Sequence, residues 1–143
     1  HSNVIEGSFR ETARSLNKSV MVFEGGETLR LDRKTVEEGL DGIKRVLQYY
    51  GMISKAPKQR QKQRFFRRST WLRADVSGLF RHRKESGQAV KEGLTLGYIS
   101  SPTNEYSVKM NSPVTGHIIG HNNFPLIHKG DALFHIGYDE TAP

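Results

Sequence analysis

The chain contains no cysteine among its 143 residues. Disulfide bonds and thiolate metal ligands are therefore excluded within it, and nothing points to an oxidising compartment, so we expect a cytoplasmic protein. It also lacks any run of about 18 apolar residues, which excludes a membrane-spanning helix. Its first residues do not show the basic-then-apolar pattern of a signal peptide. We therefore expect no membrane partner.

Acidic residues are fewer than basic ones, and the imbalance gives a formal net charge of +7. Positive charge is concentrated between Lys55 and Arg83, a stretch whose one acidic residue is Asp75. The basic side chains in this stretch include Lys58, Arg60, Lys62, Arg64, Arg67, Arg68, Arg73, Arg81 and Arg83. A basic balance of this kind is typical of proteins that bind nucleic acids or anionic substrates.

Phe65, Phe66 and Trp71 lie among these basic residues. Such a mixture would suit a nucleic-acid surface, with cations on phosphates and rings stacked on bases. No RNA-binding motif accompanies it, so we disfavour nucleic acid and prefer a solvated linker whose aromatic residues pack in an interdomain contact. A third interpretation assigns the steering of an acidic substrate to one of three arginines, Arg67, Arg68 or Arg73.

The opening of the chain predicts a helix, a strand and a second helix. The first helix spans residues 5–17 and has a capping box at Ser8. The apolar run 19–24 predicts an inner parallel strand, because such strands are buried on both faces. The second helix has its capping box at Thr35 and ends at Gly51. This α-β-α order is typical of the closing portion of a layered α/β domain, so we expect neighbouring strands outside this chain.

The rest of the chain falls into two regions of different composition. Residues 54–64 have almost no apolar side chains, as in a solvated basic linker. From Phe65 onward, short apolar runs alternate with turn residues, which predicts a small all-β barrel or sandwich. The predicted strands are Ser69–Ala74, Gly78–Arg81, Leu94–Ile99, Tyr106–Lys109, Gly116–Ile119 and Ala132–Ile136. We therefore expect three parts: residues 1–53, the linker 54–64 and a β domain over 65–140.

The β region contains an internal repeat. Residues 87–99 and 124–136 share an order of apolar residue, two polar or basic positions, Gly, Leu and Ile. This repeat indicates a quasi-symmetric fold built from duplicated hairpins. Between the two copies, Ser112-Pro113-Val114-Thr115-Gly116 resembles the Ala-Pro-x-x-Gly turn of a barrel-sandwich hybrid of the biotinyl/lipoyl type.

The order of these features along the chain resembles a known family. Glu24-Gly25-Gly26 after an apolar strand, a helix ending near residues 47–53 and then this β module are similar to the C-terminal part of the succinylglutamate desuccinylase/aspartoacylase family. Its members are zinc-dependent hydrolases related to zinc carboxypeptidases. The resemblance implies an α/β fragment, the α-β-α tail of a zinc hydrolase domain, followed by an all-β barrel-sandwich hybrid domain.

The resemblance also implies chemistry. The parent protein would hydrolyse the amide bond of N-acyl amino acids or similar small acidic compounds. Glu24 would be the catalytic residue, a general base that activates a zinc-bound water and then passes the proton to the leaving amine. The family's zinc ligands and substrate-binding arginines lie upstream of this strand. We therefore expect no metal ligand in this chain, zinc only in the full-length protein and no activity from the chain alone.

Simpler interpretations of the acidic residues stay open. Glu24 could be a solvated acid at a strand end that caps a loop or pairs with Arg30. Against this, ligands bind at the carboxyl ends of the strands in open α/β sheets, which is where the pattern places Glu24. Glu27 is the second candidate for the catalytic role, and a weaker one because it lies beyond the glycines on a loop.

Two further motifs resemble known sites. His117 and His121 have the spacing of zinc ligands on a helix, but Ile118 replaces the Glu of that signature. On a strand they would lie about 13 Å apart, too far for one ion, so we interpret them as surface or cross-strand histidines. Lys109 invites comparison with the modified lysine of biotin carriers. It lies near a strand end and not at the predicted hairpin tip 102–105, so we expect no biotin or lipoyl attachment.

Our leading hypothesis is an enzyme fragment whose β domain shapes the substrate entrance or a subunit interface. The alternatives are a non-enzymatic, lipoyl-like interaction module and a basic nucleic-acid-binding protein. The two predicted helices have apolar faces that need a partner, so we also expect a homo-oligomer.

Overall fold

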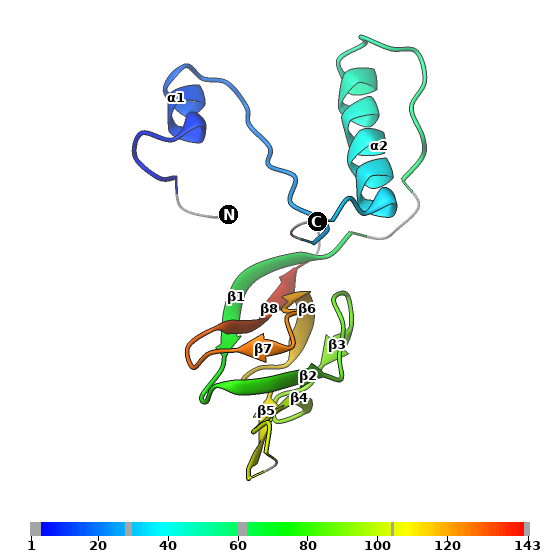
Figure 1. The fold of residues 1–143 in the computed structure, drawn as a ribbon. Coiled ribbons are helices and arrows are strands. Elements are labelled where there is room, and N and C mark those ends of the chain that lie inside the picture. Colours follow the sequence, from blue (N-terminus) through cyan, green and yellow to red (C-terminus); the bar gives the residue numbers. More distant parts are fainter. Residues whose placement is uncertain (1–3, 28–29, 60–62, 104, 142–143) are drawn as a thin grey trace. The chain divides into compact units, whose positions relative to one another are not determined.

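A computed structural model describes residues 4–27, 30–59, 63–103 and 105–141. The chain divides into two compact units, His1–Lys62 and Gln63–Pro143, which we name the helical unit and the β unit. Figure 1 shows the helices of the first unit and the strands of the second. The predicted linker 54–64 lies partly outside the described residues, as does the predicted hairpin tip at residue 104.

The helical unit begins with α1 (Phe9–Ser15). Ser8 is the N-cap as predicted, because its Oγ accepts a hydrogen bond from the backbone N–H of Glu11 at 3.3 Å. The reciprocal bond of a capping box is displaced by one residue, since the Glu11 carboxylate accepts from the backbone N–H of Gly7. The helix is shorter than the predicted span 5–17, since this cap fixes its first residue as Phe9.

The second helix, α2 (Arg33–Tyr49), begins earlier than predicted. Asp32 is its N-cap and accepts from the backbone N–H of Lys34 at 3.1 Å, so the prediction of a cap at Thr35 is wrong. The predicted end at Gly51 is confirmed. Gly51 has a φ of +70°, and the N–H of Met52 donates to the carbonyl of Leu47 at 2.9 Å, which is a Schellman C-cap.

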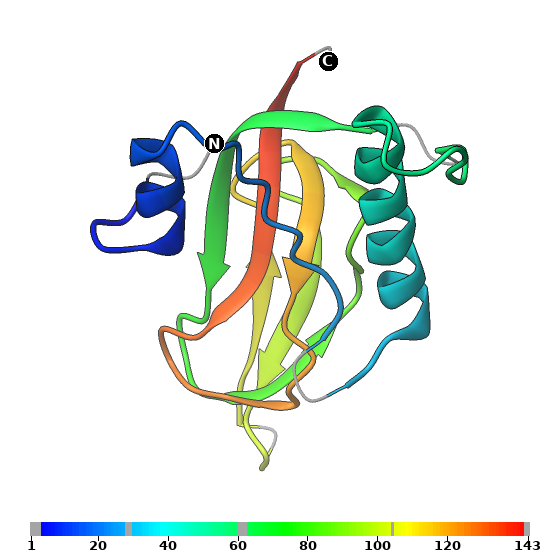
Figure 2. The same ribbon diagram turned by 90° about the horizontal axis from the view of Figure 1, so that it is seen from above.

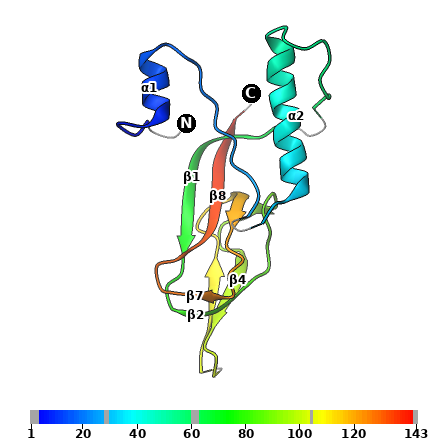
Figure 3. The ribbon, with the colours of Figure 1, turned by 45° about the horizontal axis from the view of Figure 1, so that its top comes forward.

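The predicted strand at residues 19–24 is not formed. This segment carries no strand pairing and is exposed along its length, and Figure 3 shows it as part of the extended connection from α1 to α2. The α-β-α prediction is therefore corrected to helix, extended segment, helix. A strand requires a neighbour to receive its backbone hydrogen bonds, and the described residues of this unit supply none.

The β unit contains two four-stranded antiparallel sheets. The strands are β1 (Phe65–Arg73), β2 (Gly78–His82), β3 (Ala89–Val90), β4 (Thr95–Ser100), β5 (Ser107–Asn111), β6 (Gly116–His121), β7 (Leu126–Ile127) and β8 (Ala132–Thr141). One sheet has the order β1-β8-β6-β3 and the other β5-β4-β2-β7. Figure 2 shows β8 inside its sheet, between β1 and β6. The six predicted strands are present with shifted bounds, whereas β3 and β7 were missed because two residues show no periodicity.

The two sheets are related by the internal repeat. The order β1-β8-β6-β3 matches β5-β4-β2-β7 position by position, so each sheet combines strands from both halves of the unit. The hydrogen bonds match as well. Gly93 N–H donates to the carbonyl of Ser112 at 2.8 Å, and Gly130 N–H donates to that of Ala74 at 2.8 Å. The duplication seen in the sequence is therefore a pseudo-two-fold arrangement of hydrogen-bonded strands.

Hydrogen bonds to side chains also correspond between the two copies of the repeat. Glu92 N–H donates to Thr115 Oγ1 and Lys129 N–H donates to Ser77 Oγ, both at 3.0 Å. Each bond fixes the turn that precedes the second strand of its copy. The two copies differ in one connection. β4 and β5 are consecutive strands of one hairpin, whereas their counterparts β8 and β1 are not consecutive in the chain.

The core lies between the two sheets. The side chains buried there come from both halves of the repeat: Ala74, Phe80, Val90, Leu96, Ile99, Met110, Ile118, Ile127, Leu133, Phe134 and Ile136. Phe80 and Phe134 form the aromatic contact at its centre, with ring centroids 5.8 Å apart and nearly perpendicular planes. Neither helix in the described part of the chain has the length and apolar composition needed to cross a bilayer.

Candidate functional site

Glu24 lies in the extended segment that leads to α2. The residues on either side of Glu24 approach α2. A methyl group added at Gly39 of α2 would lie 2.9 Å from Cε1 of the Phe23 ring, and one added at Gly25 would lie 2.6 Å from Cγ2 of Thr35 of α2. The chain therefore passes close to the first turns of α2 at both neighbours of Glu24. The Glu24 side chain itself is exposed.

The other acidic residue of this segment has a partner. Glu27 Oε2 lies 3.5 Å from Nε of Arg30, and both side chains are largely exposed. The ion pair considered for Glu24 and Arg30 is thus made by Glu27. Within the described residues, no side chain lies within ion-pair or hydrogen-bond distance of the Glu24 carboxylate. Glu24 is therefore the better placed of the two to meet a ligand.

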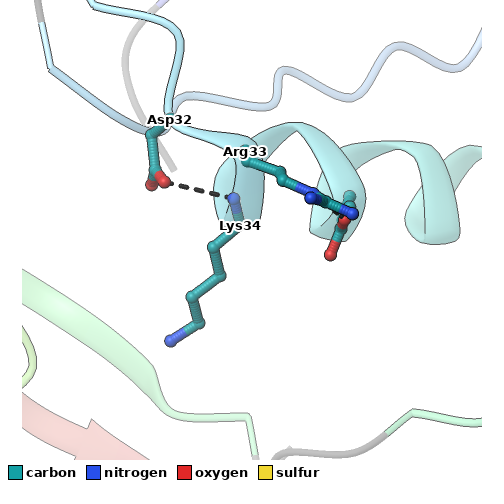
Figure 4. A network of polar contacts seen from close by, with 4 residues as sticks. Asp32, Arg33 and Lys34 are labelled. Atoms are coloured by element: carbon teal, nitrogen blue, oxygen red, sulfur yellow. Dashed lines mark hydrogen bonds and ion pairs between the residues drawn. The ribbon is translucent and has the colours of Figure 1, made fainter.

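The first turn of α2 is a compact polar network (Figure 4). Asp32 accepts from the Thr35 hydroxyl at 2.5 Å and from the Lys34 backbone N–H, while Arg33 Nε donates to Glu37 at 2.8 Å. The Thr35 hydrogen bond is the main cause that lowers the pKa of Asp32 below its ordinary value of 3.8, and the backbone bonds contribute further. The carboxylate is thereby held ionised at the positive end of the helix.

The histidines of the β unit take part in local packing. His121 Nδ1 accepts from the Ser86 backbone N–H at 3.2 Å and lies 2.8 Å from Ser86 Oγ, and its ring lies 4.6 Å from that of His82. His117 lies beside Phe66, with 5.7 Å between ring centroids. The structure agrees with the interpretation of these residues as cross-strand histidines. The Ser86 contact was missed, because nothing in the sequence pairs residues 35 positions apart.

The described residues do not form a metal centre. No group of three or more His, Cys, Asp or Glu side chains among them is placed to hold an ion. Structural and catalytic zinc sites use at least three such protein ligands. The donor set of the described residues therefore does not fit a zinc ion by itself.

Lys109 lies within β5, opposite Tyr98 of β4. Figure 1 shows the hairpin of these strands extending downward from the rest of the β unit. Lys109 is therefore on the stem of the hairpin. That biotin or lipoyl is not attached there stays a prediction.

The basic stretch is divided among several elements. Arg67, Arg68 and Arg73 lie on β1, Arg81 on β2 and Arg83 just beyond it. β1 is the edge strand of its sheet among the described residues, so its three arginines lie along a sheet edge, and this position was not predicted from the sequence. The sequence signal was present, since charged residues on a strand favour an edge position.

A groove of about 540 Å³ lies within the β unit. Its wall is mainly apolar, and sequence reasoning did not find it because its residues come from four separate segments. They are Phe66, Ala89, Val90, Lys91, Leu94, Thr115, Gly116, His117, Tyr138, Asp139 and Glu140. Lys91, Asp139 and Glu140 belong to this lining, but most of its surface is apolar, so the groove suits an apolar group better than an ionic one.

Comparison with solved structures identifies the fold of this chain. No protein-family model and no curated protein matches the chain. Among solved structures, the product-bound ectoine utilization protein EutE (DoeB) from Ruegeria pomeroyi has a TM-score of 0.78 at 20% identity, covering 92% of this chain and 41% of that one. A succinylglutamate desuccinylase from Silicibacter sp. has a TM-score of 0.76 at 21% identity, covering 93% of this chain and 42% of that one.

A succinylglutamate desuccinylase/aspartoacylase from Rhodobacter sphaeroides matches with a TM-score of 0.68 at 22% identity, over 77% of this chain and 37% of that one. The chain thus spans about two fifths of the length of these proteins. The predicted resemblance to this family is confirmed at the level of the fold: a mixed α/β piece with two antiparallel sheets matches the corresponding part of the longer structures.

Proposed function

We propose that this chain is the C-terminal portion of a zinc-dependent deacylase that hydrolyses the amide bond of N-acyl amino acids or similar small acidic compounds. The observation that carries the proposal is the match to the structure of a succinylglutamate desuccinylase over 93% of the chain at a TM-score of 0.76. The two alternatives, a lipoyl-like adaptor and a nucleic-acid binder, are not favoured, because neither accounts for the helical unit. We place the parent in the cytoplasm, in keeping with the absence of cysteine.

Glu24 is the proposed general base and acid. Its carboxylate takes a proton from the attacking water as the oxygen bonds to the acyl carbon. The same carboxyl group then returns the proton to the amine nitrogen as the carbon–nitrogen bond breaks, which leaves a free amine and a carboxylic acid. Its exposed side chain and the close approach of its neighbours Phe23 and Gly25 to α2 support this role.

The zinc of the parent would be held by residues outside this chain. The described residues offer no ligand group for it, so we assign Glu24 a role in proton transfer and not in metal binding. When bound, zinc would lower the pKa of its water to about 7. The chain alone is expected to be inactive.

We further propose that the β unit is a barrel-sandwich hybrid of the biotinyl/lipoyl type that carries no prosthetic group. Its duplicated hydrogen bonds and the matching order of its two sheets support this assignment. Such a domain would border the substrate entrance or a subunit interface and supply no nucleophile.

The test is Glu24→Gln in the full-length parent, assayed for deacylation of N-acyl amino acids with zinc content measured in parallel. We expect kcat to fall by about 10²–10⁴-fold, the usual contribution of a general acid–base group, with zinc content unchanged. The matched control is Glu27→Gln, which removes the charge of the acid paired with Arg30 and should leave kcat within about twofold. Normal activity of the Glu24 variant would refute the assigned role.

A second expectation concerns self-association. Apolar side chains of α2 are exposed, among them Ile43 at 60% and Leu40 at 49%. Exposed apolar surface of this extent favours burial against a second chain. We expect the isolated chain to elute from a size-exclusion column as an oligomer whose size rises with concentration, and Leu40→Glu with Ile43→Glu to restore the monomer. A wild-type monomer at every concentration would contradict this expectation.

A further inference from the structure

The longest open sheet edge in the β unit belongs to β1. β1 has nine residues, pairs with β8 on one side, and has no strand on its other side among the described residues. The remaining edge strands are shorter, since β5 has five residues and β3 and β7 have two each. An unpaired edge of this length offers a row of N–H and C=O groups to another extended chain.

The charge along this edge is of one sign. β1 contains Arg67, Arg68 and Arg73 and no acidic residue. Arg68 lies over the Tyr138 ring at 5.0 Å from its centroid, and Arg73 Nη1 donates to the carbonyl of Gly130 at 2.9 Å. Within the described part of the chain, none of the three arginines is within ion-pair distance of a carboxylate. By contrast, Arg64 just before the strand pairs with Glu140 at 2.9 Å.

The side chains of β1 alternate between the core face and the outer face of the sheet. Leu72 packs against the core, and alternation along a strand therefore places Arg67, Trp71 and Arg73 on the opposite face. Trp71 stacks on His135 of β8 with ring centroids 4.1 Å apart, and it remains 52% exposed. A strand added beside β1 would therefore meet two cations flanking a half-covered aromatic ring.

We propose that β1 is a docking edge for an extended acidic segment of another protein, which binds by adding an antiparallel strand to the sheet β1-β8-β6-β3. In this mode the main-chain hydrogen bonds supply affinity and alternate side chains supply specificity. Carboxylates opposite Arg67 and Arg73 would receive charge-assisted hydrogen bonds, and an apolar residue opposite Trp71 would cover its ring. A second copy of β1 is a poorer partner, because it would bring further arginines and no carboxylate to the edge.

The test uses the fluorescence of Trp71, which is the only tryptophan in the chain. The probe is a blocked peptide of the length of β1, Glu-Thr-Val-Thr-Thr-Glu-Glu-Thr-Val, titrated into the full 143-residue chain at low salt. We expect a saturable blue shift of the Trp71 emission, because the added strand removes water from the ring. The same peptide with alternate amide nitrogens methylated should give no shift, since it cannot form the ladder of hydrogen bonds.

Charge reversal on β1 distinguishes binding at this edge from attraction to the general positive charge of the chain. Arg67→Glu with Arg73→Glu should weaken peptide binding roughly tenfold, given the usual strength of exposed ion pairs. The matched control is Arg81→Glu, an exposed arginine on β2, which has strands on both sides. That variant should change the affinity by less than about twofold.

Four outcomes would overturn the proposal. One is the absence of any shift with the acidic peptide. Another is equal binding of the methylated peptide, which would leave charge attraction alone. A third is a shift that depends on protein concentration without peptide, which would assign the edge to a second copy. The last is tighter binding of an oligothymidylate than of the peptide, which would assign it to nucleic acid.

Discussion

The two units of this chain contain similar apolar patterns and bury them very differently. In the β unit, Leu96, Ile99 and Phe134 are completely buried. In the helical unit, Ala13 is the one buried apolar side chain among the described residues, while Phe9 is 80% exposed and Phe23 61% exposed. The β unit therefore carries its own core, and the helical unit carries faces that fit a core supplied from elsewhere.

The reason for the difference is topological. In the β unit each half of the repeat pairs with the other half, so every strand finds a hydrogen-bonded neighbour within the unit. The helical unit has two helices and one extended apolar segment, and a segment of this kind is stable as a strand only between other strands. An amphipathic pattern predicts which face is buried, but burial itself requires the opposing surface.

The largest effect should come from removing a core side chain. Phe134→Ala deletes a ring that contacts Phe80 across the two sheets, and we expect a loss of about 3–5 kcal/mol in the free energy of unfolding. Phe23→Ala in the helical unit should cost less than about 1 kcal/mol in the isolated chain. Urea unfolding followed by Trp71 fluorescence and circular dichroism measures both. Equal losses would contradict the contrast between the units.

A smaller effect should come from two glycines of β6. A methyl group at Gly116 would collide with the carbonyl oxygen of Gly137, a backbone atom that cannot move aside, whereas one at Gly120 would meet nothing within 4 Å. We expect Gly116→Ala to destabilise the β unit by about 1–3 kcal/mol. Gly120→Ala should leave it unchanged or raise its stability by up to about 1 kcal/mol, because alanine restricts the unfolded chain. Thermal unfolding of the two variants measures this difference. Equal destabilisation of both would contradict the prediction.

The smallest effect concerns the cap of α2. The Thr35 hydroxyl lowers the pKa of Asp32 below 3.8, so Asp32 stabilises the helix fully above that value and less as the pH falls through the lowered pKa. Helicity should therefore decrease in acid by an amount that Asp32→Asn, which keeps a capping oxygen but does not titrate, no longer shows. Circular dichroism of both proteins over this pH range measures the difference. Identical acid profiles would mean that the Asp32 charge does not stabilise the helix.

Much of the fold could be predicted from local signals. Gly51 ends α2 as expected, because a left-handed residue after a helix strongly favours glycine. The strands of the β unit follow from alternating apolar runs and turn residues, and the repeat predicted their duplication. The start of α2 was missed because Asp32 and Thr35 are both good caps, and the choice between them depends on the Thr35 hydroxyl bonding to Asp32.

The candidate site was predictable only in part. Glu24 was recognised from its place after an apolar run and before two glycines, and its catalytic role stays a prediction. The contacts that hold its neighbours, Phe23 on Gly39 and Gly25 on Thr35, could not be predicted from the sequence. Each joins the extended segment to α2 across a loop, and no local propensity encodes the distance between them.

The sequence by itself determined the local elements of this protein: the caps, the turns, the repeat and the absence of thiol chemistry. These depend on backbone preferences and on neighbours within a few residues. Only the tertiary structure decided which apolar runs become buried strands, which strand lies at the edge of its sheet, and which acidic residue pairs with Arg30. Those outcomes depend on whether a distant segment is present to complete the hydrogen bonds and cover the apolar surface.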